Sequence, residues 1–418
     1  MRELLAAALL VPSAALGSGY SLPSVVPRDL AMAGSLVAAQ DGAAAALGNP
    51  ASLSRLSGLE VSLSGALLGS GSTWTTTTGL SPSPASTELQ PAFPASGFVS
   101  WSGTLWGRGW GVGAGVSVPG GVNVTWPEGW AGRHEIQALD RKVLGACLAA
   151  GVEVIPEIRV GGGLVYYHTT EKLTVVRQIP GPPGATDGLV TVGDAGGAAS
   201  FDLSADIQPV RGFPLRIGVD YRHQAFQRLE GNVNFAFPPP LQPLYPDQEV
   251  THVLPFPNVL DVGVSWSVIP ELQVALAWTL ARTSVYGSDT FTGQTTDPAT
   301  GRPVSVAVPR NYGNGNAIRL GVAWRALPGL ELRAGGLYDR SGVDATSLHP
   351  SLPDGDAWAI SGGLGYDFAD WISASAGFSH AWHAAIASTL PSFPGTYDGF
   401  AWIASVGLRF SWSPAATR

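Results

Sequence analysis

The sequence lacks most of the features that would indicate a helical membrane protein, a disulfide-stabilised protein or a nucleic-acid-binding protein. It has 418 residues but only one cysteine, Cys147, so no disulfide can form within the chain. Only 13% of the residues are charged, and the net charge of -8 comes without any run of lysine or arginine, which excludes the basic surface of a nucleic-acid partner. Beyond the N-terminus no stretch reaches about 18 consecutive apolar residues, which excludes a helical membrane span.

Motifs of catalysis and of cofactor binding are missing as well. There is no Gly-x-Ser-x-Gly elbow, phosphate-binding loop or cluster of cysteine and histidine. His380 and His383 are three residues apart, and on a strand that spacing sends the side chains to opposite faces, which makes a poor metal site. We therefore expect no enzyme, no catalytic residue, no cofactor and no metal, although an outer-membrane lipase or esterase stays open as an alternative.

The N-terminus reads as a secretory signal. Residues 1–17, MRELLAAALLVPSAALG, combine one basic residue, an apolar centre and small residues before Gly17. The apolar centre is too short to span a membrane. We predict that residues 1–17 are removed and that the protein is exported.

Alternation of apolar and polar residues is the dominant pattern of the rest of the chain. In the last predicted strand, Phe400, Trp402, Val406, Leu408, Phe410 and Trp412 share one face, while small or polar residues and Arg409 occupy the other. Side chains alternate between the two faces of a strand, so each such strand has one apolar face. The sequence also contains 54 glycines and 14 tryptophans, which favours turns and aromatic rims.

Fourteen segments with this alternation can be recognised, and an even number suits a closed antiparallel barrel. Short turns and long loops alternate between them, as in outer-membrane barrels. A soluble sandwich or barrel also alternates, but it does not need strands of about 10 residues with aromatics near both ends of the apolar face. We predict strands at 59–70, 92–106, 109–119, 139–154, 157–172, 199–209, 213–230, 258–268, 271–287, 314–326, 329–340, 356–368, 371–383 and 398–412. The predicted fold is all-β, a fourteen-stranded transmembrane barrel at 59–412 that crosses the cell outer membrane many times, with a C-terminal tail at 413–418.

Residues 18–58 precede the strands and read differently. In DGAAAALGNPASLSRLSG, Asp41 is placed to cap a helix over 43–47 that Gly48 ends, and Asn49 is placed to cap a second turn that starts at Pro50. The segment is small, rich in alanine and without a face for water. Because a fourteen-stranded barrel leaves a wide lumen, we predict that residues 18–58 form a hatch inside it.

Several segments together resemble one known family. SGY at residues 18–20, the hatch sequence, VSVPGGVNVTW, LRIGVDYRHQ and PDGDAWAISGGLGYDF follow one another as in the outer-membrane long-chain fatty-acid and hydrocarbon transporters, often called FadL-like (OMPP1/FadL/TodX). Asp41, Asn49, Pro50 and Ala51 fall on the plug signature of that family. The resemblance covers essentially the whole chain after the signal. The tail SPAATR departs from it, because such barrels commonly end on an aromatic residue.

The resemblance implies a mechanism as well as a fold. It implies a hydrophobic capture groove in extracellular loops three and four, a deeper pocket that ends at the hatch N-terminus, and an inward kink in the third strand that opens a lateral exit. For the capture loop the residues are Phe235, Phe237, Leu241, Leu244, Tyr245, Leu254 and Phe256. For the kink they are Gly111, Gly113, Gly115 and Pro119, although tight packing of the hatch against the wall explains the glycines equally well.

The alternation of side chains along the strands indicates which residues face the lumen and could line a ligand pocket. A carboxylate ligand would need a basic partner in the lumen, because burying the charge alone is costly. The inward-facing candidates are Arg319, Arg222 and Arg141, of which Arg319 is our single choice. Tyr167, Val165, Cys147, Leu337 and Ile403 share the inward parity and could line a site for an apolar tail, or simply pack against the hatch.

Together these features predict passive uptake of hydrophobic small molecules. Long-chain fatty acids are the first expectation and hydrocarbons or aromatic compounds the second. Shelter from water provides about 0.8 kcal/mol per methylene, so capture needs no energy source. A structural or adhesive barrel is a third possibility. The expected partners are the hydrophobic ligand, outer-membrane lipid and the barrel assembly machinery, with the protein as a monomer and no nucleic acid bound.

Overall fold

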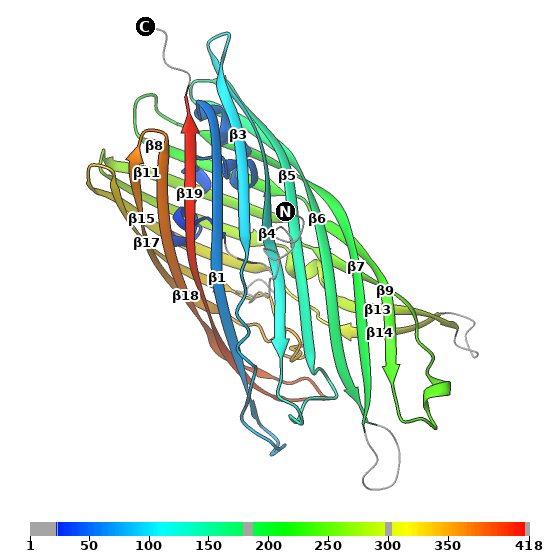
Figure 1. The fold of residues 1–418 in the computed structure, drawn as a ribbon. Helices are drawn as coiled ribbons and strands as arrows, with labels where there is room; N and C mark the ends of the chain where they lie inside the picture. Colours follow the sequence, from blue (N-terminus) through cyan, green and yellow to red (C-terminus); the bar gives the residue numbers. More distant parts are fainter. Residues whose placement is uncertain (1–21, 23, 179–186, 297–302, 414–418) are drawn as a thin grey trace.

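The protein folds as one long β-barrel that encloses a group of short helices (Figure 1). The computed structural model describes residues 22, 24–178, 187–296 and 303–413. The predicted signal peptide at 1–17 and all but the first residue of the predicted tail lie outside these residues. Among the residues that are described, no helix has both the length and the hydrophobicity needed to cross a membrane.

All strands of the described residues belong to one antiparallel sheet. They are β1 Gly58–Thr76, β2 Ala85–Ser86, β3 Ala95–Leu105, β4 Arg108–Thr125, β5 Ala138–Ile155, β6 Ile158–Arg177, β7 Gly188–Ile207, β8 Leu215–Arg222, β9 Ala225–Ala236, β10 Gln248–Phe256, β11 Val259–Ile269, β12 Leu272–Ala281, β13 Ser288–Thr296, β14 Pro303–Pro309, β15 Gly315–Leu327, β16 Leu330–Arg340, β17 Ala357–Ala369, β18 Ile372–Ser388 and β19 Gly395–Trp412.

The strands account for the fourteen predicted crossings. β8 and β9 are consecutive parts of one crossing, as are β10 with β11, β12 with β13 and β14 with β15, and β2 is a two-residue addition in a loop. The barrel closes where β1 pairs with β19, from Leu59↔Trp412 to Thr76↔Gly395. The predicted fold is therefore confirmed; β1 starts at Gly58 and β19 ends at Trp412.

Several strands run further into the predicted long loops than the alternation suggested. The predicted strand 199–209 is the end of β7, which starts at Gly188 and pairs with β6 along its whole length. The glycine-rich stretch 193–197 hides the alternation in the sequence. Hydrogen bonds to the neighbouring strands, rather than apolar side chains, hold this part of the strand.

The outer surface of the barrel carries an apolar belt. Leu148, Leu164 and Val406 are each more than 60% exposed, although all are in the middle of strands. Large aromatics, among them Trp266, Trp324 and Trp412, are also exposed. Outward apolar side chains flanked by aromatics are the pattern of a barrel that faces lipid.

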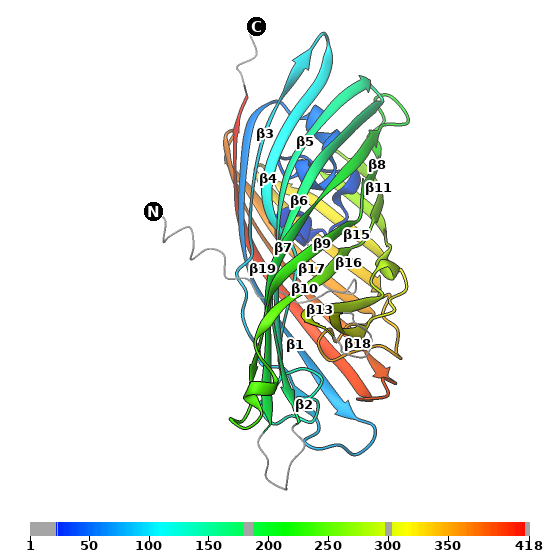
Figure 2. The ribbon, with the colours of Figure 1, turned by 90° about the vertical axis from the view of Figure 1, so that its right-hand side faces the viewer.

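In its described residues the hatch has four short helical segments inside the barrel, toward the end where β19 finishes (Figures 1 and 2). They are α2 Pro27–Ala31, η2 Leu36–Ala38, α3 Ala45–Gly48 and η3 Pro50–Arg55. Two further 3₁₀ turns, η4 Gln242–Leu244 and η5 Thr283–Val285, lie in the connections between strands.

One helical segment ends at Gly48 and the next starts at Pro50, as predicted, but the predicted side-chain caps are wrong because tertiary contacts replace them. Asp41 caps no helix; its carboxylate pairs with Arg28 at 3.1 Å. Asn49 precedes η3, but its side chain makes no capping bond and instead donates from Nδ2 to the carbonyl of Val37 at 2.8 Å. Because the barrel wall surrounds the hatch, polar side chains of the hatch find hydrogen-bond and ion-pair partners in other turns and strands, and not in the backbone of the helix that follows them.

Glycines of the barrel wall allow the hatch backbone to approach closely. A Cβ on Gly151 would lie 2.2 Å from the carbonyl oxygen of Pro50, and one on Gly161 would lie 2.3 Å from the amide nitrogen of Ala51. At both positions the hatch backbone occupies the place of a Cβ, so only glycine fits there. The hatch motif Asn49-Pro50-Ala51 is thus held by direct backbone contact with β5 and β6.

Candidate functional site

A cavity of about 310 Å³ lies between the N-terminal segment of the hatch and the barrel wall. That volume is within the range of small-molecule sites. Its apolar lining includes Leu22, Val25, Phe98, Val118 and Leu337. Hatch and wall residues thus meet around a space with a largely apolar surface.

The wall of this cavity is interrupted in β4. The pairing of β3 with β4 stops at Gly97↔Val116, while β4 continues to Thr125. On the other side, the register with β5 shifts between Ser117 and Gly120, so one extra residue bulges there. The backbone N–H of Leu22 donates to the carbonyl of Pro119 at 3.0 Å, which brings the start of the hatch to the bulge.

The residues predicted for the strand-three kink divide into two groups. Pro119 lies at the bulge. Gly111, Gly113 and Gly115 lie in the regular ladder between β3 and β5. A Cβ on Gly111 would meet the carbonyl of Leu53 at 2.4 Å, and one on Gly113 the Cβ of Ala46 at 2.9 Å. These two glycines fit the alternative explanation, in which the wall makes room for the hatch.

Arg319 borders the cavity, as parity predicted, but it has partners within the barrel. Its Nη1 lies 3.3 Å from Asp261 Oδ1 and also donates to Thr279 Oγ1. Its side chain is 22% exposed. Its stem packs beside Gly34 of the hatch. Arg319 of β15 therefore lies between the hatch and a carboxylate of β11, which is on the other side of β12.

Arg222 is the second predicted arginine at the cavity. Its Nη2 donates to the carbonyl of Leu47 in the hatch and lies 3.7 Å from Asp220 Oδ2. Four carboxyl groups border the same cavity, compared with two guanidinium groups. The four are Asp29, Asp220, Asp261 and Asp339. The polar part of the cavity is therefore richer in carboxyl groups than in cations.

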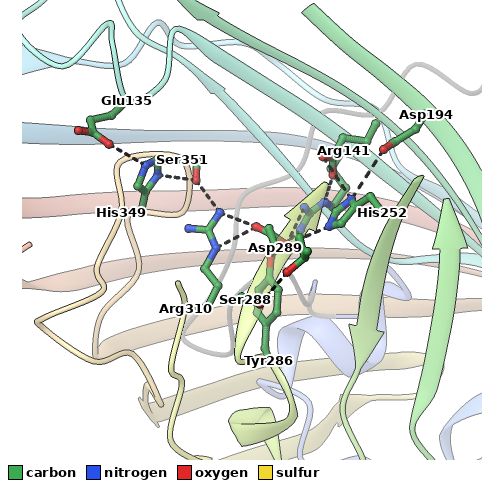
Figure 3. A network of polar contacts seen from close by, with 12 residues as sticks. Glu135, Arg141, Asp194, His252, Tyr286, Ser288, Asp289, Arg310, His349 and Ser351 are labelled. Carbon is green, nitrogen blue, oxygen red and sulfur yellow. Dashed lines mark hydrogen bonds and ion pairs between the residues drawn. The ribbon is translucent and has the colours of Figure 1, made fainter. Parts of the chain in front are cut away.

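Arg141, the third predicted arginine, lies in a separate buried network (Figure 3). Its Nε donates to Glu171 Oε2 at 2.5 Å, and its Nη2 lies 3.9 Å from Asp289 Oδ1. The side chain is 1% exposed. This placement makes Arg141 part of the structure of the barrel interior and not part of the cavity lining.

Asp289 is the centre of that network. Arg310 donates to Asp289 Oδ2 from Nε at 2.9 Å and from Nη2 at 2.6 Å, and Tyr286 donates to Oδ1 at 2.5 Å. Arg310 also donates to Ser351 Oγ, which links the network to His349 and Glu135 (Figure 3).

The predicted apolar pocket residues face inward, but most of them lie in the packed interior. Cys147, Val165 and Tyr167 are at most 5% exposed and belong to one core cluster. Ile403 packs with Leu30 of the hatch in a second cluster. Among the predicted tail residues, only Leu337 borders the cavity described above.

The residues predicted for the capture loop also fall into two groups. Phe235, Phe237 and Tyr245 form an aromatic group with ring centres 4.6 to 5.9 Å apart, and Leu244 beside it is 70% exposed. Leu241 begins the turn that leads into η4 and is half-buried.

Leu254 and Phe256 do not belong to that surface, which corrects the prediction. They lie in β10, Leu254 is fully buried, and the ring of Phe256 stacks on Tyr167 at 4.7 Å. They extend the packed interior because β10 turns their side chains to the inside of the barrel.

Sequence reasoning missed a second cavity and part of the first. A cavity of about 480 Å³ contacts the hatch at the end of the barrel with the short turns, and its lining includes Arg28, Asp41, Glu331, Arg333 and Arg409. Phe98 and Val118 of the first cavity were not predicted. The irregularity of VSVPGG was the available signal for Val118, but nothing in the local sequence marks Phe98.

The fold and its interior define a class of protein: an outer-membrane barrel whose lumen is plugged by an N-terminal hatch. Residues 8–412 match the family described as "Outer membrane protein transport protein (OMPP1/FadL/TodX)". The chain belongs to this family of transport proteins of the outer membrane, whose members transport hydrophobic compounds. No sequence among the curated proteins matches it.

Solved structures agree with this fold at low sequence identity. A Pseudomonas aeruginosa FadL homologue is 17% identical, with a TM-score of 0.82 over 94% of this chain and 100% of that one. The Ralstonia pickettii toluene transporter TbuX is 16% identical, with a TM-score of 0.71 over 94% and 99%. The Pseudomonas putida toluene transporter TodX is 14% identical, with a TM-score of 0.71 over 95% and 100%.

Proposed function

We propose that this protein takes up neutral hydrophobic small molecules by passive diffusion, with the cavity of about 310 Å³ as its binding site. The observation that carries the proposal is the lining of this cavity. Apolar side chains from the hatch and from the β4 bulge surround it, and its two arginines already have carboxylate partners.

The charges favour a neutral ligand over a carboxylate. Burying a ligand carboxylate requires a cation that is available to it. Arg319 is paired with Asp261, and Arg222 lies beside Asp220 and donates to the hatch. The cavity also has more carboxyl groups than guanidinium groups, so both of its cations already have an acidic neighbour. A hydrocarbon meets no such penalty and gains from removal of its surface from water.

The proposed route follows the features around the cavity. The half-buried rings of Phe235 and Phe237 and the exposed ring of Tyr245 supply apolar surface for capture at the end of the barrel with the long loops. The cavity receives the ligand, and the hatch closes the way along the barrel axis. The interrupted pairing beside Pro119 is the proposed lateral exit into the membrane.

The names of the similar structures support the same substrate class. TbuX and TodX are each described as a toluene transporter. We extend that description to this chain as a proposal, because identities of 14 to 16% establish the fold alone. We further propose that the chain is not an enzyme and works as a monomer. Lipid would contact its apolar belt, and the barrel assembly machinery would insert it.

Long-chain fatty acids are the second candidate, and one observation favours them. Among the residues that the structure describes, Nε of Arg222 has no hydrogen-bond partner. A rearrangement of the neighbouring side chains could offer that group to a ligand carboxylate. The two candidates differ in whether the cavity arginines contact the ligand.

Uptake by cells that express or lack the protein tests the proposal. Labelled toluene and a labelled long-chain fatty acid are compared for the unchanged protein, for Arg319→Ala and for Arg222→Ala. We expect faster toluene uptake with the protein than without it, and a change of less than about twofold for either variant.

Two outcomes contradict the proposal. Fatty-acid uptake that falls by about tenfold in an arginine variant, a loss of about 1.4 kcal/mol, would establish the carboxylate candidate. No protein-dependent uptake of either compound would leave a structural or adhesive barrel. Assembly of each variant in the outer membrane is checked in parallel by its resistance to protease.

A further inference from the structure

Three buried side chains from three strands converge inside the barrel, away from the cavity. Glu171 of β6 and Asp194 of β7 are register partners, and His252 of β10 lies beside them (Figure 3). Their exposed fractions are 4%, 5% and 1%. One ligand atom from each side chain lies within 4.8 Å of those of the other two.

The atoms that face one another lack ordinary partners. Among the described residues, His252 Nδ1, Glu171 Oε1 and both carboxylate oxygens of Asp194 accept or donate no hydrogen bond. His252 Nδ1 lies 3.7 Å from Asp194 Oδ2 and 3.9 Å from Glu171 Oε1. These distances are too long for hydrogen bonds. They are within reach of a shared ion, because two atoms each about 2.1 Å from a metal can be up to about 4.2 Å apart.

Two of the three groups, His252 and Glu171, are held in place on their other side. His252 Nε2 lies 3.2 Å from Asp289 Oδ1, so the proton belongs on Nε2 and the lone pair of Nδ1 points at the two carboxylates. The ring also stacks on Phe291 at 4.3 Å. A histidine ligand that donates its second N–H to a carboxylate is the usual support around a bound metal. Arg141 holds the other oxygen of Glu171 in the same manner.

We propose that Glu171, Asp194 and His252 form a binding site for one divalent transition-metal ion. The imidazole nitrogen is a borderline donor, which suits ions such as Zn²⁺ rather than Ca²⁺, and Zn²⁺ also accepts carboxylate oxygens. The site ties β6, β7 and β10 together and reaches β13 through Asp289. A bound ion would therefore cross-link these strands at the end of the barrel with the long loops. The site is separate from the proposed ligand cavity, and the inference does not depend on the proposed function.

The charges of the network also call for a cation. The carboxylates of Glu171, Asp194 and Asp289 face two guanidinium groups, those of Arg141 and Arg310. With a neutral histidine, one negative charge is left uncompensated. A proton on Nδ1 would balance the charge but could serve only one of the two carboxylates. A metal ion can bind all three groups at once.

Zinc binding by the full-length protein in detergent tests the inference. The protein is treated with a chelator and titrated with Zn²⁺ alone, and the bound metal and the unfolding temperature are measured. We expect one high-affinity ion per chain and a higher unfolding temperature with zinc.

Asp194→Asn is the sharpest variant, because the oxygens of Asp194 accept no hydrogen bond and the change keeps the shape of the side chain. It should weaken zinc binding at least about tenfold, as loss of a ligand does. His349→Gln is the matched control, since His349 is also buried and lies 3.3 Å from the carboxylate of Glu135 but has no third ligand among the described residues. It should bind zinc like the unchanged protein.

Two results would overturn the inference. One is zinc binding that is equal in the unchanged protein and in Asp194→Asn. The other is no zinc binding together with an NMR signal of His252 that carries protons on both ring nitrogens, since a proton would then be the missing positive charge.

Discussion

Charged residues inside this barrel are paired across strands that are far apart in the sequence. Arg310 and Asp289 are both at most 3% exposed, and so are Arg141 and Glu171. Removing one member of such a pair leaves an isolated buried charge, which costs about 3–5 kcal/mol. The charged side chains that the alternation places in the lumen therefore act mainly to stabilise the barrel.

His349 gives the network a predicted dependence on pH. The backbone N–H of Ser351 donates to His349 Nδ1 at 3.2 Å, so the neutral ring is the form that fits. Burial and the nearby Arg310 lower the pKa of His349 below its ordinary 6.5, against the opposing effects of Glu135 and Asp289. The folded state then binds fewer protons than the unfolded state, so stability falls as the pH drops below 6.5.

Protonation of Glu135 also lowers the stability of the fold, but at a lower pH. The hydrogen bond from His349 lowers the pKa of Glu135 below its ordinary 4.5, and the stabilisation it provides is lost as the pH falls through that lowered value. Hydrogen exchange of the segment 343–356 at a series of pH values measures both steps. We expect protection to decline below about pH 6.5, and the first step to disappear in His349→Gln. Equal protection at about pH 7.5 and 5 in the unchanged protein would contradict this prediction.

Gly151 is predicted to tolerate substitution poorly, because the wall meets the hatch backbone there. In Gly151→Ala the new Cβ would meet the carbonyl oxygen of Pro50 at 2.2 Å, and backbone cannot move aside as a flexible side chain can. Overpacking of this kind costs about 1–3 kcal/mol. We expect a lower unfolding temperature and faster proteolysis of the hatch.

Gly65→Ala is the control for that substitution. Gly65 is also a strand glycine, but a Cβ there meets nothing within 4 Å. It should leave both measurements unchanged. If the two variants behave alike, contact with the hatch is not the reason for the glycine at 151.

The bulge of β4 interrupts the regular ladder of the wall beside the cavity. Two residues, Val118 and Pro119, lie between the paired positions Ser117↔Gly145 and Gly120↔Val143, where β5 has only Leu144. Deleting Pro119 therefore restores a regular ladder without turning the later residues of β4 to the other face.

Deletion of Pro119 is predicted to slow toluene uptake several-fold while the barrel still assembles, because the proposed lateral exit depends on the bulge. Pro119→Ala keeps the number of residues and should retain most of the uptake. Cell uptake, together with protease resistance as a check on assembly, measures both. Uptake that is unchanged by the deletion would place the exit elsewhere. Replacing Gly111 or Gly113 is a poorer test, since both positions contact the hatch.

At the scale of the whole molecule, the barrel separates two environments with opposite chemistry. Outside, apolar side chains such as Leu148 and Val406 form a belt suited to lipid. Inside, the hatch lies between a cavity with much apolar lining and a cavity rich in paired charges. A hydrophobic compound would therefore leave sideways more readily than along the axis. Transfer of the compound from water to membrane is itself favourable, so the proposed transport needs no coupling to energy.

The sequence by itself determined the barrel, its fourteen crossings and its boundaries. Successive side chains of a pleated strand point to opposite faces of the sheet. Because the outer face of the barrel contacts lipid, the side chains on that face are apolar along the whole strand. That local rule is why β1 starts at Gly58 and β19 ends at Trp412, within one residue of the strands predicted to start at 59 and to end at 412. The same rule placed Arg319 and Arg141 inside the barrel.

Only the tertiary structure decided what those inward side chains contact. Parity gives the face of a residue but not the strand that stands opposite, which depends on how the register is staggered around the whole barrel. Arg141 and Asp289 meet although 148 residues separate them, and Glu171 meets His252 across two intervening strands. The cavity, the bulge contact of Leu22 and the proposed metal site depend on the same long-range pairing, because each is built from segments whose separation no local pattern encodes.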